Sequence, residues 1–310
     1  MKKQGEAFKT SVGGQALMEG IMMRGPEKIC VAVRKPDGDI DLSYDAVKQH
    51  PWQKIPLVRG AFNMIESLVL GYRYLMHSAQ VSMGDGFQEE ESKFDKWLEK
   101  HFGEKGQDIV LTLAAICGGM LALVLFMVLP TAIVGLINRF LPLGGFKVVL
   151  EGLVKLSLFI GYLFLCTRVK DVHRVFEYHG AEHKTIACYE AGEELTVENV
   201  RKHCRFHPRC GTSFLILVLL ISIVLFSVLP WHNTGLRVVL KILMLPLLMG
   251  ISYELIKLAG RYDNVFTRII SAPGLWMQRL TTFEPDDSMI EVAIAAVKPV
   301  LPEHREDAAW

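Results

Sequence analysis

The sequence has almost no net charge, and it has no apolar run near its first residue. Its 34 lysines and arginines nearly balance 33 aspartates and glutamates, which leaves a formal net charge of +1. Nucleic-acid-binding domains usually carry a clear excess of basic residues, so the composition gives no support to a nucleic-acid partner. Residues 1–14 lack the apolar core of a signal peptide. We therefore expect the chain to begin in the cytosol.

Internal repeats and low-complexity tracts are also lacking, and cysteines are few. The six cysteines lie either in apolar stretches or in segments that we place in the cytosol, where thiols stay reduced. We expect no disulfide bonds, and metal binding remains open as a use for these thiols. The cysteines are Cys30, Cys117, Cys166, Cys188, Cys204 and Cys210.

What the sequence does have is a large share of hydrophobic residues, 51% of 310, which is more than a soluble domain usually carries. The excess is concentrated in residues 110–137, 148–166, 214–229 and 236–258. Each stretch is close to the ~20 residues needed to cross a bilayer core. The predicted fold class is therefore an α-helical polytopic membrane protein with about four transmembrane helices and a small α+β cytosolic N-terminal cap.

Basic residues between the second and third stretches indicate the orientation. Residues 168–211 are rich in lysine and arginine, whereas the two outer connections are short and carry little charge. Loops rich in these residues stay on the cytosolic side of a membrane. We predict a multi-pass membrane protein with both termini in the cytosol. Its expected partners are the lipid bilayer and either further copies of itself or other membrane proteins.

The pattern along the chain divides it into six regions. Residues 1–60 form a Gly-rich cytosolic cap, in which residues 29–33 and 40–44 read as a β-hairpin and the earlier glycines suggest close backbone approach. The other regions are an amphipathic helix with a charged linker (61–106), the first two spans (107–168), a cytosolic His/Cys-rich loop (169–211), the last two spans (212–259), and cytosolic helices with a tail (260–310).

The most informative run is residues 177–184, which read EYHGAEHK. On a helix, His179 and His183 share one face, and Glu182 lies beside them. The spacing H-x-x-E-H is the inverted zincin motif, in which two histidines bind Zn²⁺ and the glutamate handles a proton. Gly180 weakens the helix by about 1 kcal/mol relative to alanine. A zinc site would also need a third protein ligand.

A second cluster, residues 203–210, reads HCRFHPRC and precedes the third span. His207 and Cys210 are usual zinc-ligand types, and the loop ends are expected to lie close together because two neighbouring spans hold them. The ligands could leave an open catalytic position or fill a closed structural site. The closed site would use His179, His183, His207 and Cys210. A basic stretch facing lipid phosphates would explain the arginines of this cluster but not its histidines and cysteines.

Glu254 is an acid near the cytosolic end of the fourth stretch. Ionisable groups in such positions are expensive and are often functional, so Glu254 is a candidate third ligand. A salt bridge with Lys257 or with a base of the middle loop is the alternative.

Two functions fit these residues. The first is a membrane-embedded zinc-dependent hydrolase, possibly a peptidase, acting at the cytosolic face with Glu182 as general base. The second is a non-enzymatic scaffold, assembly factor or insertion factor whose His/Cys/Glu cluster is a structural network. A transporter is less favoured, because few charges fall inside the spans.

Four segments carry a resemblance to a known family: GGQALMEGIMMRGP, EYHGAEHKTIACYE, HPRCGTSF and LTTFEPDD. Together they resemble the bacterial YqhQ family, membrane proteins of unknown function often described as predicted metal-dependent enzymes. The resemblance covers nearly the whole chain. It implies that the Gly-rich N-terminal segment, the two His/Cys clusters and the acids of residues 284–287 are parts of one arrangement that members of the family share.

Overall fold

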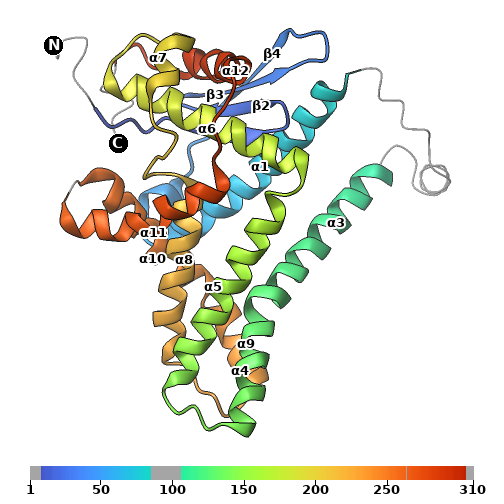
Figure 1. The fold of residues 1–310 in the computed structure, drawn as a ribbon, viewed down its shortest axis with the longest axis vertical. Coiled ribbons are helices and arrows are strands. Elements are labelled where there is room, and N and C mark those ends of the chain that lie inside the picture. Colours follow the sequence, from blue (N-terminus) through green and yellow to red (C-terminus); the bar gives the residue numbers. More distant parts are fainter. Residues whose placement is uncertain (1–7, 85–105, 263, 305–310) are drawn as a thin grey trace. The chain divides into compact units, whose positions relative to one another are not determined.

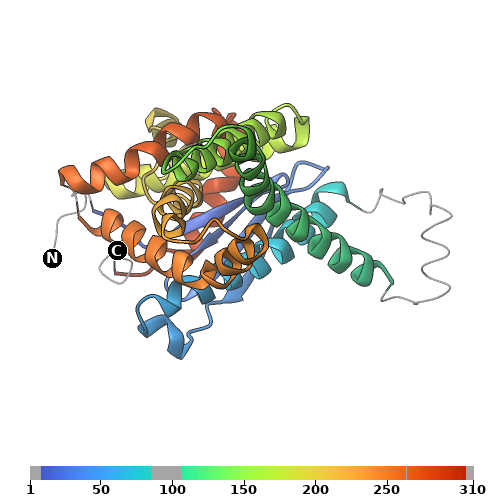
Figure 2. The same ribbon diagram turned by 90° about the horizontal axis from the view of Figure 1, so that it is seen from below.

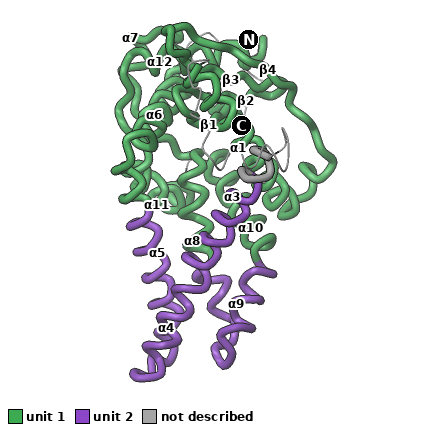
Figure 3. Tube along the Cα trace, turned by 90° about the vertical axis from the view of Figure 1, so that its right-hand side faces the viewer, with its two compact units in different colours: residues 1–84, 163–222, 245–310 green, residues 85–162, 223–244 purple. Residues whose placement is uncertain are grey.

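The computed structural model describes residues 8–84, 106–262 and 264–304. The chain forms two compact units, which Figure 3 shows in different colours. Unit 1 comprises Met1–Gly84, Leu163–Ser222 and Leu245–Trp310, and unit 2 comprises Asp85–Tyr162 and Ile223–Met244. Each unit is therefore built from segments that are far apart in the sequence.

Unit 1 contains a four-stranded antiparallel sheet with the strand order β1-β2-β3-β4. The strands are β1 (Gly13–Leu17), β2 (Gly20–Arg24), β3 (Lys28–Arg34) and β4 (Ile40–Ala46). Strands β3 and β4 pair as a hairpin over the residues expected to form one. The Gly-rich segment before them, whose secondary structure the sequence left open, supplies the other two strands (Figure 1).

Helices cover both faces of this sheet (Figures 1 and 2). Successive strand residues point to opposite faces, so Cys30 and Ala32 of β3 pack with α6 (Lys170–Ala191) and α12 (Asp287–Val297). Val31 of the same strand packs in the opposite core, which includes Tyr74 of α1 (Val58–Met83). Strand β3 is apolar on both faces and so joins two cores, and one of them includes the helix that carries the His/Glu motif.

Unit 1 also contains α7 (Val197–Lys202), α10 (Leu245–Arg261) and α11 (Val265–Thr281), with single 3-10 turns at Pro51–Lys54 and Lys298–Val300. Helices α1 and α10 pack closely at a pair of glycines. A Cβ atom on Gly60 would lie 2.8 Å from the Cα atom of Gly250. The helices approach this closely because neither glycine has a side chain.

Among the described residues, three helices are long and apolar enough to cross a membrane. The first, Thr112–Phe140, combines α3 (Gly106–Leu123), a π-helical turn (Val124–Val128) and α4 (Leu129–Phe140). The others are α5 (Phe146–Cys166) and the helix that begins as α8 (Gly211–Ser227). The protein is thus mostly helical with a small N-terminal sheet.

The fourth apolar stretch differs from the single helix expected at residues 236–258. It consists of α9 (Thr234–Leu243) and α10, and the pair is bent by 49°. Pro246 is the second residue of α10, and a proline has no N–H to continue the hydrogen bonds of a preceding helix. The break at this point follows from that missing donor. The chain has four candidate spans only if the bent pair counts as one.

Candidate metal site

Helix α6 places the three residues of the His/Glu motif together. It runs without interruption from Lys170 to Ala191 and ends at Gly192, whose φ of 78° is the left-handed conformation that glycine adopts most readily. His179 and His183 lie one turn apart, and their ring centroids are 4.4 Å from each other. Glu182 is 5% exposed beside them.

Gly180, at the centre of the motif, is required by a close backbone contact. A Cβ atom at this position would lie 1.9 Å from the carbonyl oxygen of Phe283. The N–H of Phe283 donates to the carbonyl of Phe176, 3.0 Å away. The segment after α11 therefore crosses α6 at the glycine, and this brings the carbonyl of Thr281 to 2.8 Å from Nδ1 of His179.

Cys210 joins the two histidines. Its Sγ lies 3.1 Å from Nε2 of His179, and one donor atom from each of His179, His183 and Cys210 lies within 4.8 Å of the others. The Nδ1 atom of His183 lies 2.6 Å from the carbonyl oxygen of Arg205. Because a carbonyl only accepts, Nδ1 of each ring carries a proton. Metal-binding histidines are commonly oriented by such a bond, which leaves Nε2 for the ion.

The charges at this site favour a thiolate. Burial alone raises the pKa of Cys210, but the positive charges of His179 and His183 outweigh it and hold that pKa well below the usual value. Burial alone lowers the pKa of His179, yet the charge of Cys210 and the hydrogen bond between them raise it to about 9. The thiolate is the form that binds metals, and the imidazolium of His179 that stabilises it would have to lose its Nε2 proton when an ion binds.

Glu182 is held by the Gly-rich strand β1. The N–H of Gly14 donates to Oε1 of Glu182 at 3.0 Å, and a Cβ atom on Gly14 would lie 2.4 Å from the carbonyl oxygen of Met22. Burial raises the pKa of Glu182, and the nearby charges of His179 and His183 only partly oppose this. The close backbone approach suggested by the glycines is therefore an approach to the motif itself.

His207 lies next to the three donors but belongs to a separate network. Its ring centroid is 5.6 Å from that of His183. Its Nε2 atom lies 3.1 Å from Nη2 of Arg209 and 3.5 Å from a carboxylate oxygen of Glu190. Burial lowers the pKa of His207, and the side chain of Gln278 bonds to both its backbone N–H and its carbonyl. These contacts position the loop that carries Cys210.

Glu254, the other candidate ligand, is not brought to this cluster. Its carboxylate accepts two hydrogen bonds from the guanidinium of Arg59, at 2.7 and 2.5 Å, and one from the N–H of Leu57 at 3.2 Å. The physical reason is the packing of α10 against α1, which supplies Arg59. The salt bridge of Glu254 is thus with Arg59 of α1, and the charge of Lys257 also acts on Glu254.

The acids of residues 284–287 hold the crossing segment in place. Glu284 accepts from Lys184 and Arg205, each at 2.7 Å. Asp286 caps the N-terminus of α12 by accepting from a backbone N–H at 2.9 Å, and Asp287 pairs with an arginine of α7. These contacts tie the segment to α6, to α7 and to the loop before Cys210.

Sequence reasoning missed the groups that orient the two imidazoles. These are the backbone carbonyls of Thr281 and Arg205, and a carbonyl is present at every residue, so no residue type signals it. The glycines at positions 14 and 180 were the available signals, because each permits a close backbone approach.

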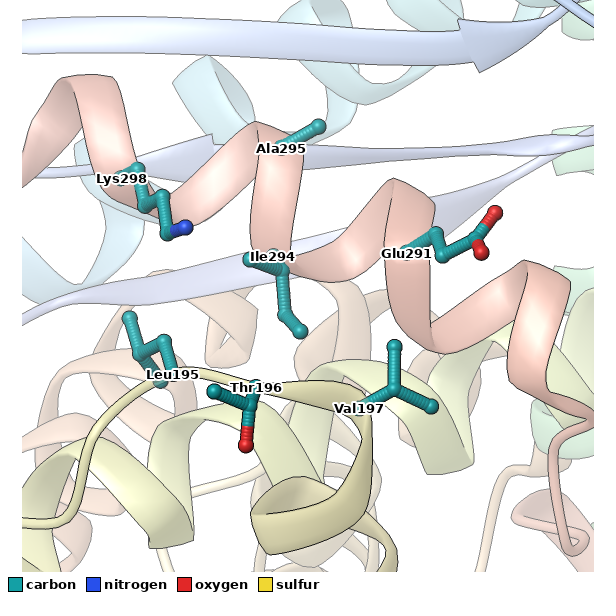
Figure 4. Close-up of a pocket in the computed structure, with 7 residues that line it drawn as sticks. All are labelled: Leu195, Thr196, Val197, Glu291, Ile294, Ala295 and Lys298. Carbon is teal, nitrogen blue, oxygen red and sulfur yellow. The ribbon is translucent and has the colours of Figure 1, made fainter.

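Two other features of unit 1 lie outside this cluster. Cys188, Glu193 and His203 form a second group of possible donors, in which His203 pairs with the half-exposed Glu193 at 3.2 Å. An open pocket lies between α12 and the segment that leads into α7 (Figure 4). It is lined by Leu195, Thr196, Val197, Glu291, Ile294, Ala295 and Lys298.

Comparison with known proteins places the chain in a family. A family model described as "Protein of unknown function (DUF1385)" matches residues 55–303. The "Uncharacterized protein YqhQ" of Bacillus subtilis (strain 168) is 33% identical over 303 residues, which cover 93% of this chain and 92% of the relative. No solved structure matches the chain. Since both matches extend over most of its length, the chain belongs to the DUF1385 family, to which the resemblance to YqhQ pointed.

Proposed function

We propose that the protein is a multi-pass protein of the bacterial cytoplasmic membrane that acts as a zinc-dependent hydrolase, possibly a peptidase, at the cytosolic face. The observation that carries this proposal is the meeting of His179, His183 and Cys210 beside the buried carboxyl of Glu182. Three helices long and apolar enough to cross a bilayer support the membrane location. The basic loop at residues 168–211 supports the orientation.

The donor set suits zinc. Imidazole nitrogen and thiolate sulfur are its usual ligands, and three protein ligands are typical of catalytic zinc sites with an open fourth position. Among the residues that the structure describes, this group contains three donors within reach of one another. Zinc with an open position acts as a Lewis acid and lowers the pKa of water to about 7.

The protein's own residues would perform three tasks. The carbonyls of Thr281 and Arg205 hold the two imidazoles. Glu182, oriented by the N–H of Gly14, would accept and return a proton, and burial raises its pKa above the usual value of a carboxyl group. Glu182 and His183 are buried, whereas His179 is partly exposed.

A non-enzymatic scaffold is the second candidate, and a specific contact favours it. His179 already has a partner at each ring nitrogen, the carbonyl of Thr281 and the sulfur of Cys210. A polar network whose groups are all satisfied fixes a loop without an ion. In this case, the cluster would hold α6 and the start of α8 together for an assembly or insertion role.

Metal analysis of the full-length protein, purified in detergent without chelators, tests the zinc site. We expect about one zinc ion per chain in the wild type. Cys210→Ser and His183→Ala should each lose the ion, and Cys204→Ser, which changes an exposed thiol of the same loop, should keep it. Wild-type protein free of metal would refute the hydrolase and leave the scaffold.

Cobalt substitution then separates an open site from a closed one. If the metal has an open position, added azide should change the visible d–d bands of the cobalt protein. Glu182→Gln should retain the ion and this response, since Glu182 is assigned no ligand role, but should lose activity in cells that depend on the protein. Bands that azide does not change would indicate a closed structural site.

The membrane location and orientation are tested separately. The protein should stay in the membrane pellet during alkaline carbonate extraction, and a reporter fused after Trp310 should report a cytosolic C-terminus. Release into the supernatant would refute the location.

A further inference from the structure

Unit 2 contains a buried group of charged side chains within its apolar helices. Arg237 and Lys241, one turn apart on α9, are both 0% exposed, and Glu151 of α5 is 4% exposed. Nη2 of Arg237 donates to one oxygen of Glu151 at 2.9 Å, and Nζ of Lys241 pairs with the other. Thr131 of α4 completes the group, with its hydroxyl 2.7 Å from Nζ of Lys241. The charged residues within the apolar stretches of unit 2 thus lie together.

Lys155 adds a third cation to this group. It lies one turn after Glu151 on α5 and is 8% exposed. The charged groups that act on it are those of Lys241, Glu151 and Arg237. Three cations and one carboxylate give this group a net charge of +2 among the described residues.

Such an excess of positive charge is unusual for a buried group of ion pairs whose role is only structural. One cation would neutralise Glu151, and the burial of each further charge in an apolar environment is strongly unfavourable unless an opposite charge compensates it. Both oxygens of Glu151 are already engaged by Arg237 and Lys241. The group therefore has more positive charge than its own carboxylate can balance.

Two hydrogen-bond donors at the same place are unsatisfied. Nε of Arg237 and Nε1 of Trp231 are buried and have no hydrogen-bond partner in the described part of the chain. The two side chains stack, with Cζ of Arg237 3.9 Å from the centroid of the Trp231 ring. A further cation, Lys147, has its Nζ 5.8 Å from the same ring. Excess positive charge and unused N–H donors thus coincide at one site.

We propose that this site in unit 2 binds the phosphate group of an anionic ligand. Phosphate offers the negative charge that the cluster lacks and acceptor oxygens for the free N–H donors, and a guanidinium is well suited to bind it. Glu151 and Lys155 are the sixth and tenth residues of α5, about 8 and 14 Å along the helix axis from its start. In the membrane location proposed above, on which this inference rests, the phosphate would come from a lipid headgroup or from solution at the outer end of the helices.

Native mass spectrometry of the full-length protein in detergent tests this inference with two probes, phosphatidylglycerol and inorganic phosphate. We expect wild type to bind one of them and Lys155→Gln to bind it at least 10-fold more weakly. Lys155→Arg, which retains the charge, should keep the affinity. Arg139→Gln, which removes an exposed cation of the same unit, serves as the matched control and should also bind as wild type does.

The outcomes of this experiment distinguish the two possible sources of the phosphate group, and some of them would refute the proposed binding site. Binding of phosphatidylglycerol alone identifies a headgroup, and binding of inorganic phosphate identifies a soluble ligand. If Lys155→Gln does not fold, Arg237→Lys retains the charge but removes the Nε donor and should weaken binding in the same way. Equal affinity in wild type and in either variant, or no binding of either probe to wild type, overturns the proposal. Zinc content is measured on the same samples and should not change, so failure here is distinct from failure of the hydrolase.

Discussion

Alanine at position 180 sets two physical effects against each other. In a helix, alanine is more favourable than glycine by about 1 kcal/mol, so the local sequence predicts that Gly180→Ala stabilises α6. The tertiary structure predicts the reverse, because the new Cβ atom would lie 1.9 Å from the carbonyl oxygen of Phe283. Whether Gly180→Ala raises or lowers the stability of the protein therefore shows whether the segment after α11 crosses α6 at this residue.

The magnitude follows from that contact. A carbon and a carbonyl oxygen normally approach to about 3.3 Å, so the crossing segment must move by roughly 1.4 Å. Forcing an extra methyl group into a packed interior costs about 1–3 kcal/mol, and the loss of the bond from Phe283 N–H to Phe176 adds about 1 kcal/mol. After the gain in helix propensity, we expect a net loss of about 1–3 kcal/mol.

The same shift would disturb the metal site. Movement of the segment lengthens the 2.8 Å bond between the carbonyl of Thr281 and Nδ1 of His179. Loss of such an orienting bond typically weakens metal binding 10-fold to 100-fold. We expect Gly180→Ala to combine a lower melting temperature with a zinc affinity reduced by about that factor.

Thermal unfolding in detergent and zinc titration against a competing chelator measure the two effects. Gly161→Ala on α5 is the matched control, because nothing lies within 4 Å of its added Cβ atom. It should raise the melting temperature slightly or leave it unchanged, and it should not alter zinc affinity. A Gly180→Ala protein as stable as wild type, with unaltered zinc affinity, would show that residues 281–285 do not cross α6 as described.

Two further predictions concern carboxylates. Glu254→Gln should leave zinc content unchanged and cost about 1 kcal/mol, because its partner is Arg59; metal analysis checks this, and loss of zinc would restore Glu254 as a ligand. The pKa of Glu190 is lowered, because its bonds and charge contacts with His207 and Arg209 outweigh the effect of burial. The ionised Glu190 side chain therefore stabilises the folded protein fully above the pKa that this group has in the unfolded chain, near 4.5. This stabilisation is lost as the pH falls through the lower pKa that Glu190 has in the folded protein. Melting temperatures from about pH 3 to about pH 7 should fall less steeply below pH 4.5 in Glu190→Gln than in wild type; parallel curves would refute this.

Residue types and spacing were enough to predict part of this architecture. The H-x-x-E-H spacing indicated that His179 and His183 share a helix face, and α6 has them one turn apart. Apolar runs indicated the long helices, and alternation indicated the β3–β4 hairpin. In each case a short-range pattern determines the structure, because helix and strand periodicity place neighbouring residues on known faces.

Contacts between distant segments could not be read in the same way. Glu254 is 195 residues from Arg59 in the sequence, and Glu151 pairs with Arg237 and Lys241 of α9. In sequence, Lys155 is the nearest base to Glu151 at helical spacing, and an i,i+4 pair is favourable by only a few tenths of a kcal/mol. Tertiary packing of α9 against α4 and α5 easily outweighs so small a preference.

In the candidate site, two glycines mark the places where other segments contact the His/Glu motif, whereas the acids of residues 284–287 do not. A Cβ atom on Gly180 would clash with the carbonyl oxygen of Phe283, and one on Gly14 would clash with that of Met22 and lie 3.2 Å from Cδ of Glu182. The backbone groups that reach the motif at these places are the carbonyl of Thr281 and the N–H of Gly14. The acids at residues 284–287 instead act at a distance, by fastening the segment whose carbonyl orients His179. Substitution of these acids should therefore loosen the imidazole without removing a ligand, whereas a side chain at either glycine would displace the group that makes the contact.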